Sequence, residues 1–144
     1  MVISRQCLSE IEAHAVRDYP RECCGVLLGS RAGAECKVIE VRPCRNVVER
    51  PETSYRIEPT DLIAIQRDAR DRGLQVGGFY HSHPGRPAEP SARDLKKAEW
   101  DNCSYLIVSV AEVDGVAQAG GARSFILVAS PSRKLQEEKT RIME

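Results

Sequence analysis

The chain has 144 residues, the length of one ordinary domain that can bury a sizeable core. Its 21 basic and 21 acidic residues cancel, which argues against a broad basic surface for nucleic acid. No apolar run approaches the roughly 18 residues that cross a membrane, and the first residues lack a signal-peptide pattern. We therefore expect a single cytoplasmic domain over residues 1–144, with neither nucleic-acid nor membrane partners.

The first half of the chain predicts two helices and a hairpin. Ser4 is a candidate N-cap for the first helix, and Pro20 follows its end because proline cannot continue a helix. Pro59 stands near the start of the second helix, and Gly73 marks its end. In chain order the expected elements are a helix over 4–18, strands over 24–28 and 36–41, a loop over 43–54, a short strand over 55–57 and a helix from 59 to 73.

The second half predicts a buried central strand followed by a loop, a short helix and further strands. These are a strand over 74–82, a proline-rich loop over 84–90, a helix over 91–100 and strands over 105–110 and 124–128. The tail, residues 131–144, fits either a charged helix or a last edge strand near 140–143. The pattern alone indicates one domain of the α/β or α+β class.

Two histidines at the end of the central strand are the strongest chemical signal. His81 and His83 are two residues apart, so a strand directs both imidazoles to the same side. Asp94 follows after ten further residues and adds a carboxylate. Two imidazoles and one carboxylate form a three-ligand set for zinc that leaves a fourth position for water. The alternative to a metal site is that the two histidines are simply polar residues at the end of a strand.

Ser91 and Asp94 also fit a purely structural pattern. A serine followed three residues later by an acid, at the start of a helix, is typical of a capping box. In that interpretation Ser91 accepts a backbone hydrogen bond and Asp94 favours the helix N-terminus. Local pattern alone favours this interpretation over a catalytic one, although the two are not fully exclusive for Ser91.

The sequence His81-Ser-His-Pro, followed by Ser91-x-x-Asp94, resembles the JAMM (MPN-plus) metallopeptidase family. Residues 20–29, Pro-Arg-Glu-Cys-Cys-Gly-Val-Leu-Leu-Gly, are similar to a second segment of that family, with Glu22 in the place of its glutamate. The resemblance extends from about residue 3 to about residue 128. It implies a curved mixed β-sheet flanked by helices, in the cytidine-deaminase-like α/β class.

The resemblance also implies a role for each site residue. His81, His83 and Asp94 are then ligands of Zn²⁺, Glu22 is the general base, and the Ser91 hydroxyl stabilises the oxyanion. Without the resemblance, Glu22 would be interpreted as a solvated surface acid. The implied activity is cleavage of an amide bond after the C-terminal glycine of a ubiquitin-like or sulfur-carrier protein that ends in Gly-Gly.

A catalytically inactive MPN-type scaffold is the alternative function, although all five expected polar positions are filled here. A zinc deaminase needs His-x-Glu and Pro-Cys-x-x-Cys signatures, which the sequence lacks.

Several other residues carry structural expectations. The six cysteines are expected to be buried free thiols, and Ser82 is expected to pack. Gly77 and Gly78 favour a bulge in the central strand, and close approach of a substrate strand is the alternative. His14 is expected at the surface or in helix packing, and Trp100 in the core.

Overall fold

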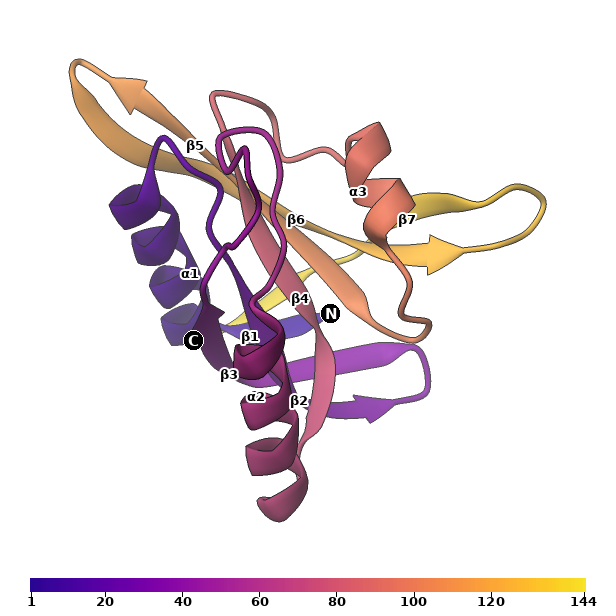
Figure 1. Cartoon of the computed structure of the whole chain (residues 1–144). Helices are drawn as coiled ribbons and strands as arrows, with labels where there is room; N and C mark the ends of the chain where they lie inside the picture. The colour runs from indigo at the N-terminus through magenta and orange to yellow at the C-terminus, as the bar shows by residue number, and fades with distance from the viewer.

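The computed structural model describes residues 1–144 and shows one mixed sheet with three helices (Figure 1). The helices are α1 (Arg5–Asp18), α2 (Pro59–Asp71) and α3 (Ala92–Lys97). The strands are β1 (Val2–Ser4), β2 (Cys24–Ala32), β3 (Glu35–Cys44), β4 (Gln75–Pro84), β5 (Ser104–Val113), β6 (Val116–Val128), β7 (Lys134–Glu138) and β8 (Arg141–Met143). Their order across the sheet is β7-β6-β5-β4-β2-β3-β1-β8.

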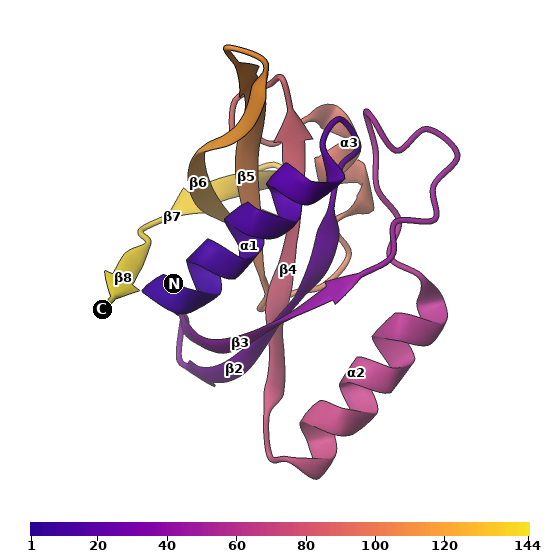
Figure 2. The same ribbon diagram turned by 90° about the vertical axis from the view of Figure 1, so that its left-hand side faces the viewer.

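The two edges of the sheet come from neighbouring segments of the chain. β7 and β8 stand at opposite ends of the strand order, yet only residues 139 and 140 separate them. At about 3.8 Å per residue, Glu138 and Arg141 lie no more than about 11 Å apart. The sheet therefore curls until its edges approach each other, which confirms the expected curved mixed sheet of the α/β class (Figure 2).

α1 covers one face of this sheet (Figure 2). The Ser4 hydroxyl caps the helix by accepting a hydrogen bond from the backbone N–H of Cys7 at 3.1 Å. Apolar residues at helical spacing then place Leu8, Ile11 and Ala15 in the core between the helix and the strands. The expected N-cap and helix are confirmed.

α2 packs on the opposite face. Pro59 occupies its first turn, where the missing N–H costs nothing, and the helix buries Ile65 and Ala69 against Val26 and Leu28 of β2. Leu27, between these two strand residues, joins the core on the α1 side. Both faces of β2 are thus covered, which explains why its sequence is an unbroken apolar run rather than an alternating one.

β4 lies in the middle of the sheet and positions the predicted ligands. It pairs with β2 antiparallel and with β5 parallel. Because a parallel pair needs a crossover, the chain leaves the end of β4, forms α3 and returns to start β5. The register with β2 shifts where Leu27 pairs with Gly78 and Leu28 with Val76, which leaves Gly77 as the extra residue of the expected bulge.

The structure decides between the two alternatives for the tail and corrects four other expectations. The tail forms two strands, so the helical alternative is wrong and the edge strand is right. β6 begins eight residues before 124, and the expected strand at 55–57 is reduced to one bridge between Asn46 and Ile57. α3 ends at Lys97, and Trp100 is 36% exposed instead of being in the core.

The six cysteines are all buried and free, as expected. None of the helices has the length and apolar character that a membrane crossing demands.

Candidate metal centre

The predicted histidine pair is buried at the end of β4. His81 is 2% exposed and His83 is 1% exposed. Because they alternate with Ser82, both rings lie on one face of the strand, and their Nε2 atoms are 3.1 Å apart. Ser82 points the other way, where its hydroxyl accepts a hydrogen bond from the backbone N–H of Cys23 at 2.8 Å. This confirms the packing role expected for Ser82.

α3 brings a carboxylate to the same place. Asp94 Oδ1 is 3.0 Å from His81 Nε2, and Asp94 Oδ2 is 3.0 Å from His83 Nε2. The same aspartate completes a capping box: the Ser91 N–H donates to Asp94 Oδ2 at 2.8 Å, and the Ser91 hydroxyl accepts from the Asp94 N–H at 3.1 Å. Asp94 therefore serves both interpretations at once, since the cap holds it in the orientation that faces the histidines.

A backbone carbonyl determines which nitrogen of His83 carries the proton. His83 Nδ1 lies 2.9 Å from the carbonyl oxygen of Pro87. A carbonyl can only accept, so Nδ1 donates, and a neutral ring then keeps a free lone pair on Nε2. That lone pair faces the other imidazole and the carboxylate of Asp94. A metal-binding histidine is commonly oriented in this way through its second nitrogen.

The ionisation of these groups suits a metal ion. Burial lowers the pKa of His81, which favours the neutral ring. Burial acts to raise the pKa of Asp94, but the nearby His81 and His83 rings and the hydrogen bond from the Ser91 N–H outweigh burial and leave that pKa below its ordinary value. Neutral imidazoles and an ionised carboxylate are the forms that bind metal. The ligand atoms of the three side chains all lie within 4.8 Å of one another, so the set could hold a metal ion.

Glu22 is a buried acid beside this group. It is 2% exposed, so the interpretation as a solvated surface acid is wrong. Cys24 pairs with His81 across β2 and β4. Because the pairing is antiparallel, two residues earlier on β2 corresponds to two residues later on β4, and the register carries Glu22 to the level of His83.

The loop after β3 holds the backbone of Glu22. Its N–H donates to the carbonyl of Pro51 at 2.6 Å, and its carbonyl accepts from the Asn46 side chain at 2.9 Å. In the side chain, Oε2 accepts from Arg86 Nη2 at 2.7 Å, whereas Oε1 is buried and has no partner. A buried polar atom without a partner is rare in a folded protein and indicates a place for a water, an ion or a substrate group.

Burial raises the pKa of Glu22 to about 7, although the charges of His83 and Arg86 act to lower it. An acid with this pKa can accept and return a proton near neutral pH, which is the property required of a general base.

Packing around Tyr80 explains two residues near Glu22, Gly25 and His14. At Gly25 any Cβ would lie 2.3 Å from a ring carbon of Tyr80, so only glycine leaves room for that ring. The Tyr80 hydroxyl in turn lies 2.8 Å from His14 Nδ1, and His14 Nε2 lies 3.2 Å from a carboxylate oxygen of Asp18. His14 is buried, which confirms its packing role and excludes its surface alternative.

Three residues of the site were not predicted from the sequence. The Tyr55 ring stacks on the His81 ring with centroids 4.4 Å apart. The ammonium group of Lys97 donates to the Ser54 hydroxyl and the Tyr55 carbonyl, and it lies 5.2 Å from the centre of the Tyr55 ring. Arg86 contacts Glu22. The only signal for Arg86 was its place in the loop between the histidines and Asp94.

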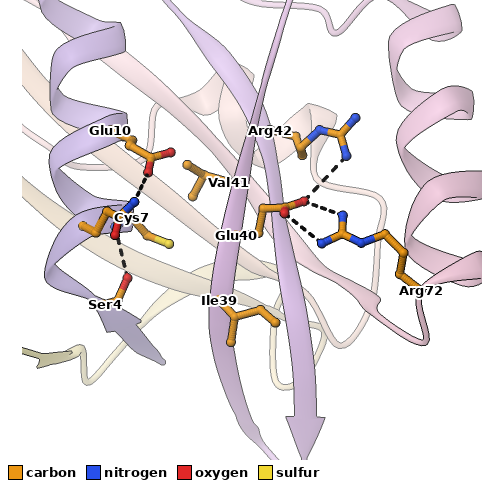
Figure 3. Close-up of a pocket in the computed structure, with 9 residues that line it drawn as sticks. Ser4, Cys7, Glu10, Ile39, Glu40, Val41, Arg42 and Arg72 are labelled. Carbon is orange, nitrogen blue, oxygen red and sulfur yellow. Dashed lines mark hydrogen bonds and ion pairs between the residues drawn. The ribbon is translucent and has the colours of Figure 1, made fainter.

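The cavities of the molecule differ in their relation to this site. A largely apolar cavity of about 460 Å³ adjoins it, and Tyr55, Lys97 and Trp100 are among its lining residues. A polar cavity of about 530 Å³ lies between α1 and α2 across β3 (Figure 3). In that cavity Glu40 is bound by Arg72 and Arg42. No predicted site residue lines it, and its charged groups neutralise one another.

Known proteins resemble this chain over most of its length. A desampylase of Haloferax volcanii is 36% identical over 102 residues, which cover 71% of this chain and 72% of the relative. A probable TtuB-protein conjugate cleaving protease of Thermus thermophilus is 37% identical over 127 residues, or 88% of this chain and 76% of the relative. A CysO-cysteine peptidase of Mycobacterium tuberculosis is 34% identical over 113 residues, or 76% and 73%.

Solved structures share the fold of this chain. The solution structure of a protein from Desulfitobacterium hafniense superposes with a TM-score of 0.82 at 30% identity, over 99% of this chain and 92% of the other. A JAB1/MPN domain protein from Archaeoglobus fulgidus superposes with a TM-score of 0.61 at 22% identity, over 100% and 97%, which shows the fold alone. The family model described as prokaryotic homologs of the JAB domain matches residues 4–125. This chain therefore belongs to the prokaryotic JAB-domain family, as its resemblance to JAMM/MPN sequences indicates.

Proposed function

We propose that this protein is a zinc-dependent hydrolase that cleaves an amide bond after the C-terminal glycine of a ubiquitin-like or sulfur-carrier protein. The observation that carries the proposal is the convergence of His81, His83 and Asp94 beside the buried carboxyl of Glu22. The names of the relatives, two of which refer to cleavage of conjugates or adducts of named small proteins, support the substrate class.

The three side chains supply the ligands. His81 and His83 offer their Nε2 atoms, and Asp94 offers a carboxylate oxygen. When bound, zinc would lower the pKa of water to about 7 and polarise the scissile carbonyl. A set of three protein ligands is typical of catalytic zinc sites, whereas structural sites are closed by four.

Glu22 handles the proton. As the water oxygen bonds to the carbonyl carbon, the Glu22 carboxylate accepts a proton from that water. It then gives the proton to the leaving nitrogen as the C–N bond breaks. The products are the carrier with a free glycine carboxylate and an amine. The raised pKa of Glu22 suits both transfers, and its unpartnered Oε1 leaves an oxygen free for the water.

Ser91 stabilises the negative oxygen that develops on the substrate. As an N-cap its hydroxyl oxygen uses a lone pair to accept from the Asp94 N–H. The O–H hydrogen is not consumed by that bond, so it is free to donate to the oxyanion. The cap and the oxyanion role are therefore compatible in one residue.

The test combines metal content with turnover. We expect the purified protein to bind about one zinc per chain and to cleave a carrier protein fused through its terminal Gly-Gly to a reporter peptide. Removal of zinc by a strong chelator should abolish cleavage, and added zinc should restore it. A protein that binds no zinc and cleaves nothing would instead be the scaffold alternative.

A further inference from the structure

Arg86 joins the buried base to the surface of the site. Its Nη2 donates to Glu22 Oε2 at 2.7 Å, and its side chain is 36% exposed, whereas that of Glu22 is 2% exposed. A guanidinium has five N–H donors in a planar fork. The contact with Glu22 is the only side-chain hydrogen bond of Arg86, so the remaining donors are free on the outer side.

The position of Arg86 relative to Glu22 determines which part of a substrate it can contact. In the proposed reaction Glu22 gives its proton to the leaving nitrogen, so that nitrogen must lie at hydrogen-bond distance from the Glu22 carboxylate. In an α-amino acid the carboxylate is separated from this nitrogen by a single carbon. A guanidinium bonded to Glu22 is therefore within reach of it. In a lysine isopeptide the leaving nitrogen is at the end of a long side chain, and no carboxylate lies nearby.

The charges of the site favour an anionic leaving group. Glu22 and Asp94 contribute two negative charges, and Arg86 and Lys97 contribute two positive charges. Lys97 Nζ lies 5.2 Å from the centre of the Tyr55 ring, and that ring stacks on His81, so the charge of Lys97 is at the same site. A bound divalent cation would add two positive charges and leave the site with an excess of positive charge. A substrate with a free carboxylate next to the scissile bond would offset part of that excess.

We propose that Arg86 binds the α-carboxylate of the leaving amino acid and thereby makes the protein selective for a single amino acid attached by a peptide bond to the carrier's terminal glycine. This inference rests on the proposed function and adds a specificity residue to it. Arginine suits the task because its fork binds a carboxylate in a bidentate manner.

The test uses matched substrates that differ only in one group. The carrier ending in Gly-Gly is extended with alanine as the free acid, with alanine as the carboxamide, or with a lysine side chain in isopeptide linkage. We expect wild-type kcat/KM for the free acid to exceed that for the carboxamide by about tenfold or more, the value of one charge-assisted contact at a half-exposed position. The isopeptide should be no better than the carboxamide.

Substitution of Arg86 separates recognition from positioning. If Arg86 binds the carboxylate, Arg86→Gln should lower kcat/KM for the free acid to near that for the carboxamide, and Arg86→Lys should keep part of the difference. If Arg86 only positions Glu22, both substrates should lose activity by the same factor, which would overturn the inference. Arg67→Gln removes the same charge from an exposed position of α2 and should preserve the wild-type ratio.

A binding measurement does not depend on turnover. Calorimetry with metal-free protein should show about tenfold tighter binding of the free-acid adduct than of the carboxamide, and Arg86→Gln should remove the difference. If the wild type binds and cleaves the free acid and the carboxamide equally well, the role of Arg86 in carboxylate binding is refuted, and the proposed function is not. Failure to cleave any of the three in the presence of zinc would refute the proposed function itself.

Discussion

Ser91→Ala is the sharpest test of the site, because it separates two roles that one hydroxyl can fill. The structural role is the N-cap of α3, where the hydroxyl accepts from the Asp94 N–H at 3.1 Å. Loss of such a cap costs about 1 kcal/mol. In a chain of this size that loss lowers the melting temperature by about 3 °C. The reciprocal bond from the Ser91 N–H to Asp94 Oδ2 survives the substitution, so Asp94 keeps its orientation.

The catalytic role predicts a much larger effect on rate. Removal of one oxyanion donor lowers kcat by about 10²- to 10³-fold, which corresponds to about 2.7–4 kcal/mol of transition-state stabilisation. The rate effect of Ser91→Ala should therefore be more than twice as large, in free energy, as its effect on stability. Binding of an uncleaved carrier tail should change little, because the donor acts only as charge develops.

Ser4→Ala is the matched control, since Ser4 caps α1 with the same geometry. Its hydroxyl accepts from the Cys7 N–H at 3.1 Å, far along the chain from the site. Both variants should show a similar fall in melting temperature, and only Ser91→Ala should lose turnover. The assay measures melting temperature, zinc content and kcat on one preparation of each variant. A Ser91→Ala protein that is destabilised like Ser4→Ala but turns over normally would leave Ser91 with the structural role alone.

Further substitutions test the remaining assignments. Glu22→Gln should retain zinc and lose about 10²- to 10⁴-fold in kcat, because an amide cannot accept the proton; a near-normal rate, or loss of the metal, would show that Glu22 is not the base. His83→Ala should lose zinc by elemental analysis, and a zinc content equal to that of the wild type would remove His83 from the ligand set. The pKa of Glu22 is about 7 in the folded protein against an ordinary 4.5, so the unfolded state loses its proton first and stability falls as pH rises from about 4.5 through 7. In melting scans of metal-free protein, Glu22→Gln should therefore gain stability over the wild type at pH 8 but not at pH 4, and a difference independent of pH would contradict the raised pKa. Gly25→Ala should destabilise the fold strongly, because the new Cβ would collide with the Tyr80 ring, and a melting temperature within 1–2 °C of the wild type, roughly the effect of a neutral surface change, would show that the ring can move.

Several features of the protein follow from the sequence by itself, because short-range geometry decides them. Ser4 and Pro59 mark the beginnings of α1 and α2, since capping and proline preferences act within one helical turn. The alternation of a strand places His81 and His83 on one side before any partner is known. The resemblance to a family identifies Glu22 as the candidate general base, whereas no local pattern would distinguish it from a surface acid.

Long-range pairing decided what the sequence left open. The charged sequence of the tail is compatible with a helix. The curl of the sheet instead brings the tail to both edges, where β7 pairs with β6 and β8 pairs with β1. The first half of β6 carries small and polar residues, and only its pairing with β5 makes it a strand. Trp100 lies beyond the last turn of α3, so it packs edge-on against Phe79 at the surface.

The site itself shows the same division. The sequence supplied the types and spacing of the candidate ligands, but the capping box and the contact with the histidines competed as explanations of Asp94. Only the crossover from β4 through α3 to β5 decided that one carboxylate does both, because it sets the start of the helix against the end of the strand. The contact between Arg86 and Glu22 joins residues 64 positions apart. No local pattern encodes it, because the register of β2 against β4 brings these two segments together.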